Sequence, residues 1–138
     1  MHRTPIQVRF ADTDALGHVN NAVFATYAET ARLAFFRKEA GLYGSAGELA
    51  GFILARLAVD FRSQVLLGQE VTVLTRIAEL GRTSLTVQQQ VMADGVLAAE
   101  VESVIVCFDY EKQRPVRIPA ELRERAEQLL ARAASEEG

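Results

Sequence analysis

Residues 10–21 hold several groups that could do chemistry within a short stretch of chain. Two carboxylates, Asp12 and Asp14, stand beside His18, one of the two histidines in the sequence, and two asparagines follow at positions 20 and 21. The stretch lies between an alternating segment typical of a strand and a long apolar pattern typical of a helix. Folding alone rarely needs so many polar groups together, so we interpret the stretch as an active-site segment that the rest of the chain positions.

Each of these groups also has a purely structural interpretation. Aspartates in turns commonly accept hydrogen bonds from nearby backbone N–H groups, and we favour this role for Asp12. His18, next to Gly17, could hold the loop by hydrogen bonding rather than take part in proton transfer. We expect no metal site, because one histidine and two carboxylates form no established ligand spacing here.

The elements on either side of this segment are predicted from the pattern of apolar residues. Residues 5–10 alternate between apolar and polar, which predicts a half-buried strand. A helix is predicted over residues 22–40, with Asn20 as its N-cap and Asn21 as the competing cap. Gly41 is placed to end that helix. One apolar stripe is expected on it, formed by Phe24, Ala28, Ala31 and Phe35.

Long β patterns follow without an intervening helix, which predicts an antiparallel sheet. Asp94-Gly95 is typical of a two-residue hairpin turn, and Gly81-Arg82 marks a second tight turn. At ~3.3 Å per residue, strands of about eleven residues would be ~35 Å long, enough to wrap around the predicted helix. The predicted strands cover residues 52–62, 70–80, 82–93 and 96–110.

A final helix is predicted from residue 120 to about residue 133, with Pro119 as its N1 residue. Glu121 and Arg125 stand four positions apart and could form an ion pair on its surface. Residues 135–138 are expected to be a frayed tail.

Length and composition limit the class of protein. The chain has 138 residues, so residues 1–138 are expected to form a single domain. The net charge of −3 gives no general attraction to nucleic acid or to anionic membranes. The single cysteine, Cys107, is expected in the core and cannot form an intrachain disulfide. The first residues lack the pattern of a signal peptide, and we expect a cytoplasmic protein.

The strand predicted at residues 96–110 is apolar on both sides over much of its length. Such a strand is typically buried on both faces of its sheet. The predicted helices cover one face, so a homodimer or a larger assembly is expected to cover the other.

Three motifs together resemble a known family. They are Asp12-Thr13-Asp14-x-x-Gly17-His18-Val19-Asn20-Asn21, Tyr27-x-Glu29-x-x-Arg32 and Gly81-Arg82-Thr83-Ser84. With the element order, they make the chain similar to the hot-dog-fold thioesterases, in the 4-hydroxybenzoyl-CoA thioesterase-like branch, over roughly residues 5–110. The resemblance implies an α+β hot-dog fold, in which a curved antiparallel sheet wraps around a long central helix, with an additional C-terminal helix.

The resemblance also implies how the segment works. Asp14 would be the catalytic carboxylate and would act on a thioester as nucleophile or as general base for water. Backbone N–H groups near Asn20, Asn21 and Ala22 would polarise the thioester carbonyl. Physical chemistry supports this second role independently, because the first N–H groups of a helix lack intrahelical partners and the macrodipole favours negative charge.

Two further side chains are candidates for the site. Glu29 would hold water or contribute a second polar group, unless it only forms an ion pair with Arg32 on the helix surface. His18 is a supporting candidate. Another branch of the family carries a histidine where this chain has Asn21, and its role cannot be transferred to His18, which lies three positions earlier.

Arg82, Thr83 and Ser84 match a segment that approaches the nucleotide end of coenzyme A in relatives. A guanidinium and two hydroxyls suit phosphate contacts, although Arg82 could equally be a solvated turn residue. The family's active sites lie across subunit interfaces, so a homodimer or homotetramer is expected. Coenzyme A would be part of the substrate, and no metal or redox cofactor is expected.

The sequence therefore predicts an acyl-CoA thioesterase that releases a free carboxylic acid and coenzyme A. One alternative is a hot-dog hydratase or dehydratase of acyl thioesters, in which Asp14 and His18 would act together. Another is a non-catalytic acyl-CoA-binding domain. The acyl group is left open; residues 41–51 and the helix face around Val23, Phe24 and Tyr27 are expected to shape its pocket.

Overall fold

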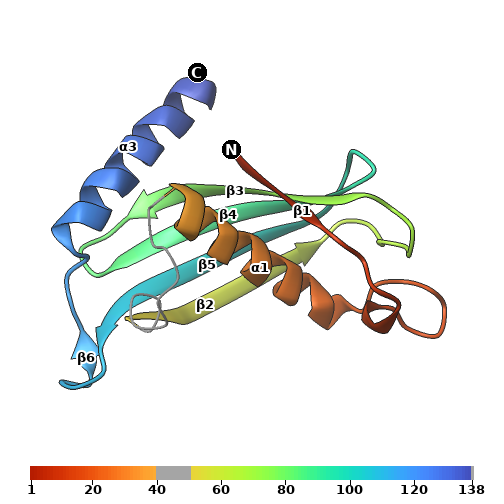
Figure 1. The fold of residues 1–138 in the computed structure, drawn as a ribbon, viewed down its shortest axis with the longest axis horizontal. Coiled ribbons are helices and arrows are strands. Elements are labelled where there is room, and N and C mark those ends of the chain that lie inside the picture. The colour runs from red at the N-terminus through yellow and green to blue at the C-terminus, as the bar shows by residue number, and fades with distance from the viewer. Residues whose placement is uncertain (40–50, 138) are drawn as a thin grey trace.

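The computed structural model describes residues 1–39 and 51–137 of the chain. Its elements follow the predicted order, with a short 3₁₀ turn, η1, ahead of the long helix and a two-residue strand, β6, ahead of the last helix (Figure 1). They are β1 (His2–Ile6), η1 (Phe10–Asp12), α1 (Asn21–Glu39), β2 (Phe52–Phe61), β3 (Val71–Leu80), β4 (Ser84–Ala93), β5 (Val96–Asp109), β6 (Arg114–Pro115) and α3 (Ala120–Glu137).

All strands belong to one antiparallel sheet with the order β1-β3-β4-β5-β2, and β6 pairs with the end of β5. The long helix α1 lies across one face of this sheet, and the sheet curves around it (Figure 1). Helix α3 packs near the end of the sheet where β3 turns into β4. The predicted α+β architecture is confirmed.

Side chains alternate between the two faces of the strands, as the period-2 pattern predicts. On β3, Val71, Val73, Thr75 and Ile77 are buried beneath α1, whereas the residues between them are half-buried on the outer face. The predicted stripe of α1 supplies the opposing surface, because Phe24, Ala28, Ala31 and Phe35 are all buried. Burial of this apolar surface is the main force holding helix to sheet.

Strand β5 departs in part from its prediction. Val101, Ser103, Ile105 and Cys107 are buried on the inner face. Their neighbours Val104, Val106 and Phe108 are only half-buried on the outer face. Burial raises the pKa of the Cys107 thiol to about 11, against a smaller opposing effect of the Arg123 charge, so the thiol stays protonated.

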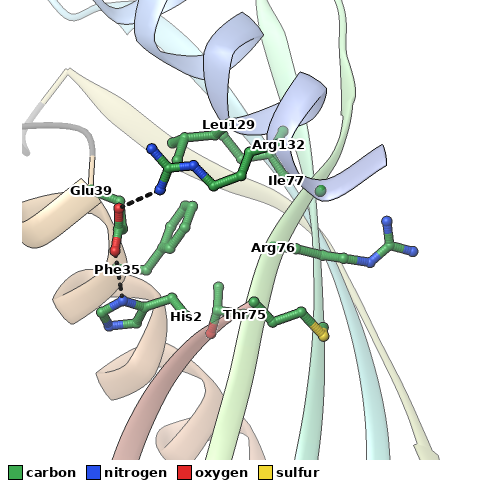
Figure 2. A pocket seen from close by; sticks show the side chains of 10 residues that line it. His2, Phe35, Glu39, Thr75, Arg76, Ile77, Leu129 and Arg132 are labelled. Atoms are coloured by element: carbon green, nitrogen blue, oxygen red, sulfur yellow. Dashed lines mark hydrogen bonds and ion pairs between the residues drawn. The ribbon is translucent and has the colours of Figure 1, made fainter. Parts of the chain in front are cut away.

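Helix α3 is fastened to α1 and β1 through Glu39, the last residue of α1. The Glu39 carboxylate lies 3.3 Å from His2 Nδ1 and 3.7 Å from Arg132 (Figure 2). It also lies 3.5 Å from Arg125. Beneath these charges, the apolar face of α3, namely Leu122, Ala126 and Leu129, packs into the same core cluster as Ile77 and Phe35. Arg125 thus pairs with a residue far away in sequence, whereas the sequence suggested a pairing with Glu121.

Some predicted boundaries are wrong. The first strand covers His2–Ile6 rather than residues 5–10, because Ile6 pairs with Val71, where β3 begins, and the residues after Ile6 have no strand beside them. The Pro119 carbonyl accepts the first hydrogen bond of α3, from Arg123, so proline is the N-cap rather than N1. The last helix continues to Glu137, where a frayed tail was expected. The predictions for Gly41 and for nearly all of residues 41–51 lie outside the described residues.

Strand β2 forms one edge of the sheet, and its inner face is poorly covered. The ring contacts between α1 and β2 lie at the two ends of the strand, Phe24 with Phe61 and Phe36 with Phe52. Leu54 and Leu57 stand between them on the inner face, since they pair with the inward-facing Ile105 and Ser103. These two leucines are 45% and 39% exposed.

Among the described residues, no helix is long and apolar enough to cross a membrane.

Candidate active site

The loop between β1 and α1 is closed by backbone hydrogen bonds onto itself and onto the β2–β3 connection. Thr13 bridges to Val19, and the Asn20 N–H donates to the Asp12 carbonyl at 2.9 Å. Val19 N–H donates to Val65 at 2.7 Å. Gly17 has φ +80°, a left-handed conformation that favours glycine at this turn. The loop is therefore a fixed support for its side chains.

Asp12 is a structural residue at the centre of this loop. Its carboxylate is 3% exposed and accepts hydrogen bonds from the Arg9 N–H at 3.0 Å, the Arg9 guanidinium at 2.9 Å and the Tyr27 hydroxyl at 2.8 Å. Burial alone would raise its pKa, but these hydrogen bonds together lower it. Burial, and then the bond to Asp12, raise the pKa of Tyr27. Asp12 thus stays ionised and ties the loop to α1.

Asp14 is exposed, and its carboxylate is fixed by the loop backbone. Oδ1 accepts the Leu16 N–H at 2.9 Å and the His18 N–H at 3.1 Å. The Asp14 N–H donates in turn to the His18 carbonyl at 2.8 Å. The backbone of His18 therefore holds the loop, while its side chain is half-buried beside Asp14.

Asp14 lies on the wall of an open cleft of about 590 Å³. His18, Asn20 and Asn21 line the same cleft. Of the four predicted catalytic residues, the structure therefore brings together Asp14, His18 and Asn21, but not Glu29. The other walls come from Leu16, Val19 and Phe24 and from the end of β2 with the residues after it, Phe61, Arg62, Ser63 and Gln64. No sequence pattern singled out this last stretch, which reaches the cleft through the Val65 pairing.

The N-terminus of α1 opens into this cleft with fewer available donors than the sequence suggested. Asn20 is the N-cap: its Oδ1 accepts the Ala22 N–H and its carbonyl accepts the Val23 N–H, both at 2.9 Å. Since the Asn20 N–H is bound to Asp12, two of the three predicted donors are occupied. Within the described residues, the Asn21 N–H is the one of the three that no protein acceptor engages. The positive end of the helix and this N–H favour an anionic oxygen there.

Glu29 does not line the cleft that holds Asp14. It is exposed on α1, two turns beyond the helix start. Arg32 is buried, and its Nη1 donates to the Ser103 hydroxyl at 3.2 Å. Burial lowers the pKa of Arg32, and the charge of Glu29 acts in the opposite direction with a smaller effect.

Arg82, Thr83 and Ser84 lie in and beside the β3–β4 turn, which the Gly81 N–H closes on the Ser84 carbonyl at 2.8 Å. Arg82 lines an open groove of about 690 Å³ together with Arg117 and Arg123, beside the first residue of α3, Ala120. Sequence reasoning missed Arg117 and Arg123, which lie at this turn because the Ile118 N–H donates to the Arg82 carbonyl at 3.1 Å and α3 begins directly afterwards. Three guanidiniums around one groove suit an anionic group such as a phosphate.

The β3–β4 turn beside this groove and the β1–α1 loop beside the Asp14 cleft lie at opposite ends of the protomer (Figure 1). Strand β3 connects the two ends: Val71 pairs with Ile6 near the loop, and Leu80 leads into the turn. A ten-residue strand is ~33 Å long. A single protomer therefore does not bring Asp14 and Arg82 together.

Among the described residues, no group of three or more histidine, cysteine, aspartate or glutamate side chains is arranged to hold a metal ion.

The fold and the loop together define a class of protein. The chain belongs to the thioesterase-like superfamily, whose family model matches residues 8–126. The hot-dog fold implied by the sequence motifs is confirmed by solved thioesterase structures. One from Bacillus stearothermophilus, described as a predicted thioesterase, is 32% identical with a TM-score of 0.85, covering 93% of this chain and 95% of that one.

Particular relatives carry more specific descriptions. A thioesterase from Thermus thermophilus, solved with coenzyme A and zinc, is 40% identical with a TM-score of 0.82, and covers 94% of this chain and 93% of that one. The acyl-CoA thioester hydrolase YbgC of Escherichia coli is 28% identical over 121 residues, 86% of this chain and 90% of that protein. The long-chain acyl-CoA thioesterase FadM of Escherichia coli is 25% identical over 130 residues, 93% of this chain and 98% of that protein.

Proposed function

We propose that this protein is a thioester hydrolase that converts acyl-CoA into a free carboxylic acid and coenzyme A. The family, and relatives described as acyl-CoA thioesterases, support this class of reaction. One observation carries the proposal: the Asp14 carboxylate is exposed and fixed on the wall of the cleft into which α1 points its N-terminus. We further propose a cytoplasmic location and a reaction without metal or redox cofactor.

The reaction divides between the carboxylate and the helix end. A thioester carbonyl oxygen placed at the Asn21 N–H would gain negative charge in the transition state, and the helix N-terminus stabilises that charge. Asp14 attacks the carbonyl carbon as nucleophile, or accepts a proton from an attacking water. The carbon–sulfur bond breaks, the sulfur leaves with a proton as the thiol of coenzyme A, and water supplies the oxygen of the new acid.

We propose that the working form is a homodimer joined along β2, able to associate further into a homotetramer. The exposed inner face of β2 supports this, because an edge strand with exposed leucines is suited to pair with another strand. If the two copies pair their β2 strands antiparallel about a two-fold axis, both α1 helices lie on the same side of the joined sheet. The β3–β4 end of one sheet then lies beside the loop end of the other. The arginine groove of one copy then approaches the Asp14 cleft of the other, so one coenzyme A could contact both. The half-buried outer face of β5 could supply the tetramer contact.

Thiol release from a panel of acyl-CoA substrates tests the activity, and Asp14→Asn tests the site. The variant should lower kcat by about 10²–10⁴-fold, since it removes the proton acceptor but keeps the side-chain shape. Its unfolding curve should match the wild type. The exposed Glu124→Gln, with the same change of charge on α3, is the control and should retain activity. Near-normal kcat in Asp14→Asn would refute the role of Asp14.

A hydratase or dehydratase is the second candidate, because His18 lines the same cleft as Asp14. That reaction changes the acyl chain and leaves the thioester intact. A change in the acyl chain without thiol release would therefore favour it over hydrolysis, and tight binding without either product would favour a binding domain.

A further inference from the structure

Arg32 contributes the only charged side chain to a small apolar pocket in the described part of the chain. The pocket has a volume of about 100 Å³ and lies between the second half of α1, the start of β2 and the middle of β5. Its other walls are Leu33, Phe36, Phe52, Ile53, Leu54 and Ile105.

Burial of the Arg32 guanidinium in this position costs folding free energy. Arg32 is only 7% exposed, and burial of a charge disfavours folding unless partners compensate it. Within the described residues, its one hydrogen bond goes to Ser103, a neutral hydroxyl, although a guanidinium has five N–H donors. Glu29 is the acidic residue whose charge acts on Arg32, but it is exposed, and solvent screens such interactions. The pocket therefore offers a buried positive charge that the protein matches only in part.

The pocket is separated from Asp14 in one protomer and near it in the proposed dimer. Leu54 lines the pocket and Phe61 lines the Asp14 cleft, and these residues are ~23 Å apart along β2. An antiparallel pairing of β2 with its copy places the Phe52 end of one strand beside the Phe61 end of the other. In that dimer the pocket of one copy would lie beside the cleft of the second copy, on the side toward which the acyl chain of a bound thioester could extend.

We propose that this pocket takes the distal end of the acyl group and that Arg32 binds a carboxylate there. The preferred substrates would then be monothioesters of short dicarboxylic acids. This inference rests on the proposed thioesterase function and on the proposed dimer. The pocket is small, at about 100 Å³, which suits the end of a short acyl group better than a long chain. A carboxylate also matches the planar donor pair of a guanidinium better than any neutral group does.

Succinyl-CoA and butyryl-CoA form the matched pair of probes, since both have four-carbon acyl groups and they differ by a carboxylate against a methyl group. The wild type should have the higher kcat/KM for succinyl-CoA. Arg32→Met should lower kcat/KM for succinyl-CoA by at least about tenfold, the loss of one charge-assisted pair, and leave butyryl-CoA unchanged or improved. A wild type without this preference, or an equal loss on both probes, would overturn the inference.

Two further variants separate binding from folding. Arg32→Lys keeps the charge and should retain part of the preference for succinyl-CoA, even if it loses stability. Ser103→Ala removes only the neutral partner and should keep the preference. Loss of the preference in Ser103→Ala to the same degree as in Arg32→Met would mean that Arg32 acts through packing, and the inference would be wrong. Absence of thiol release from every acyl-CoA would instead refute the proposed function itself.

Mixing two variants that are each impaired on succinyl-CoA tests whether Asp14 and Arg32 act across the interface. Asp14→Asn and Arg32→Met are unfolded together and refolded as a mixture, and succinyl-CoA hydrolysis is measured. If the site joins Asp14 of one copy to Arg32 of the other, each mixed dimer has one intact site, and about a quarter of wild-type activity should return. If the mixture is no more active than the average of the two separate variants although mixed dimers form, the two residues do not share a site between copies.

Discussion

Asp12 and Asp14 are two positions apart in the same loop, yet their surroundings suit them to different roles. Asp12 is buried and receives three hydrogen bonds, so its charge is fully used in holding the loop against α1. Asp14 is exposed, and both of its hydrogen bonds go to one oxygen, Oδ1. The other oxygen can therefore face a substrate in the cleft, which is the arrangement expected of a carboxylate that reacts.

Replacing Asp12 by Asn should destabilise the protein by about 1–3 kcal/mol, because an amide cannot accept all of these donors and leaves one unpaired. The effect should depend on pH. The folded-state pKa of Asp12 lies below its value of about 3.9 in the unfolded chain, so its stabilisation is complete above that pH and is lost as the pH falls through the folded pKa. Urea unfolding of wild type and variant between pH 7 and pH 3 measures this difference.

Asp14→Asn is the matched control for stability, since the same substitution at an exposed position should leave the unfolding free energy nearly unchanged. A difference between wild type and Asp12→Asn that stays constant down to pH 3 would contradict the assignment of a lowered pKa to Asp12.

The catalytic role of Asp14 stays a prediction. For Asp12, sequence reasoning favoured the structural role that the structure shows, because aspartates in turns commonly accept hydrogen bonds from nearby N–H groups. It could not foresee that the Tyr27 hydroxyl binds Asp12, since that contact depends on the angle at which α1 leaves the loop. It also overestimated the number of free donors at the helix start. The N-cap and the loop backbone occupy two of them, and this competition depends on distances that no pattern encodes.

Helix α3 depends on the charges around Glu39 as well as on its apolar face. Glu39→Gln should weaken the attachment of α3 by about 1 kcal/mol, since it removes one acceptor charge shared by His2, Arg125 and Arg132. The loss should shrink at high salt, because partly exposed ion pairs are screened. Hydrogen exchange of α3 amides measures the effect, and the exposed Glu121→Gln on the same helix should not reproduce it. Equal effects of the two variants would refute the role of Glu39.

The helices and strands could be predicted from the sequence wherever neighbouring residues alone determine their limits. The hairpin at Asp94-Gly95 has positive φ at both positions, 48° and 79°, as its two-residue turn requires, and the strands around it were correct to within about two residues. The first strand was placed too late because its limit is set by β3, more than sixty positions away, rather than by its own alternation. The Glu39 contacts escaped prediction for the same reason.

At the scale of the whole molecule, the proposed β2 interface can be broken by one charge. Leu57→Lys places an ammonium on the exposed inner face, where a second copy would bury it, and should shift the protein to a monomer and reduce turnover. Sedimentation velocity measures the mass. Val96→Lys is the control, because Val96 is 60% exposed at a hairpin on another part of the surface. A Leu57→Lys protein with unchanged mass would exclude this interface.

The arginine groove can be tested with a truncated substrate. Arg117→Ala should raise KM for acyl-CoA by about tenfold and leave the matching acyl-pantetheine unaffected, because the truncated substrate lacks the nucleotide phosphates that the groove would bind. Arg37→Ala, an exposed arginine of α1 outside the groove, is the control. An equal effect of Arg117→Ala on both substrates would exclude phosphate recognition at this position.

The fold class and the family could be predicted from the sequence because alternation, turn residues and motifs are local. The relation between the two ends of the molecule could not. Arg82 and Asp14 both carry family motifs, but the length of β3 keeps them apart in one copy. Likewise, Arg32 reads as a helix-surface residue in the sequence, and only the crossing of α1 over β5 buries it.

The register of β2 against β5 is interrupted between Leu54 and Arg56, so Ala55 has no partner residue on β5. A bulge bends its strand and breaks the even spacing of unpaired N–H and C=O groups along the free edge. A regular strand from an unrelated protein could form backbone hydrogen bonds with only part of this edge. A strand with the same bulge, related by a two-fold axis, can pair along its length. In the proposed dimer, this irregularity would disfavour pairing of β2 with unrelated strands and leave pairing with a second copy possible.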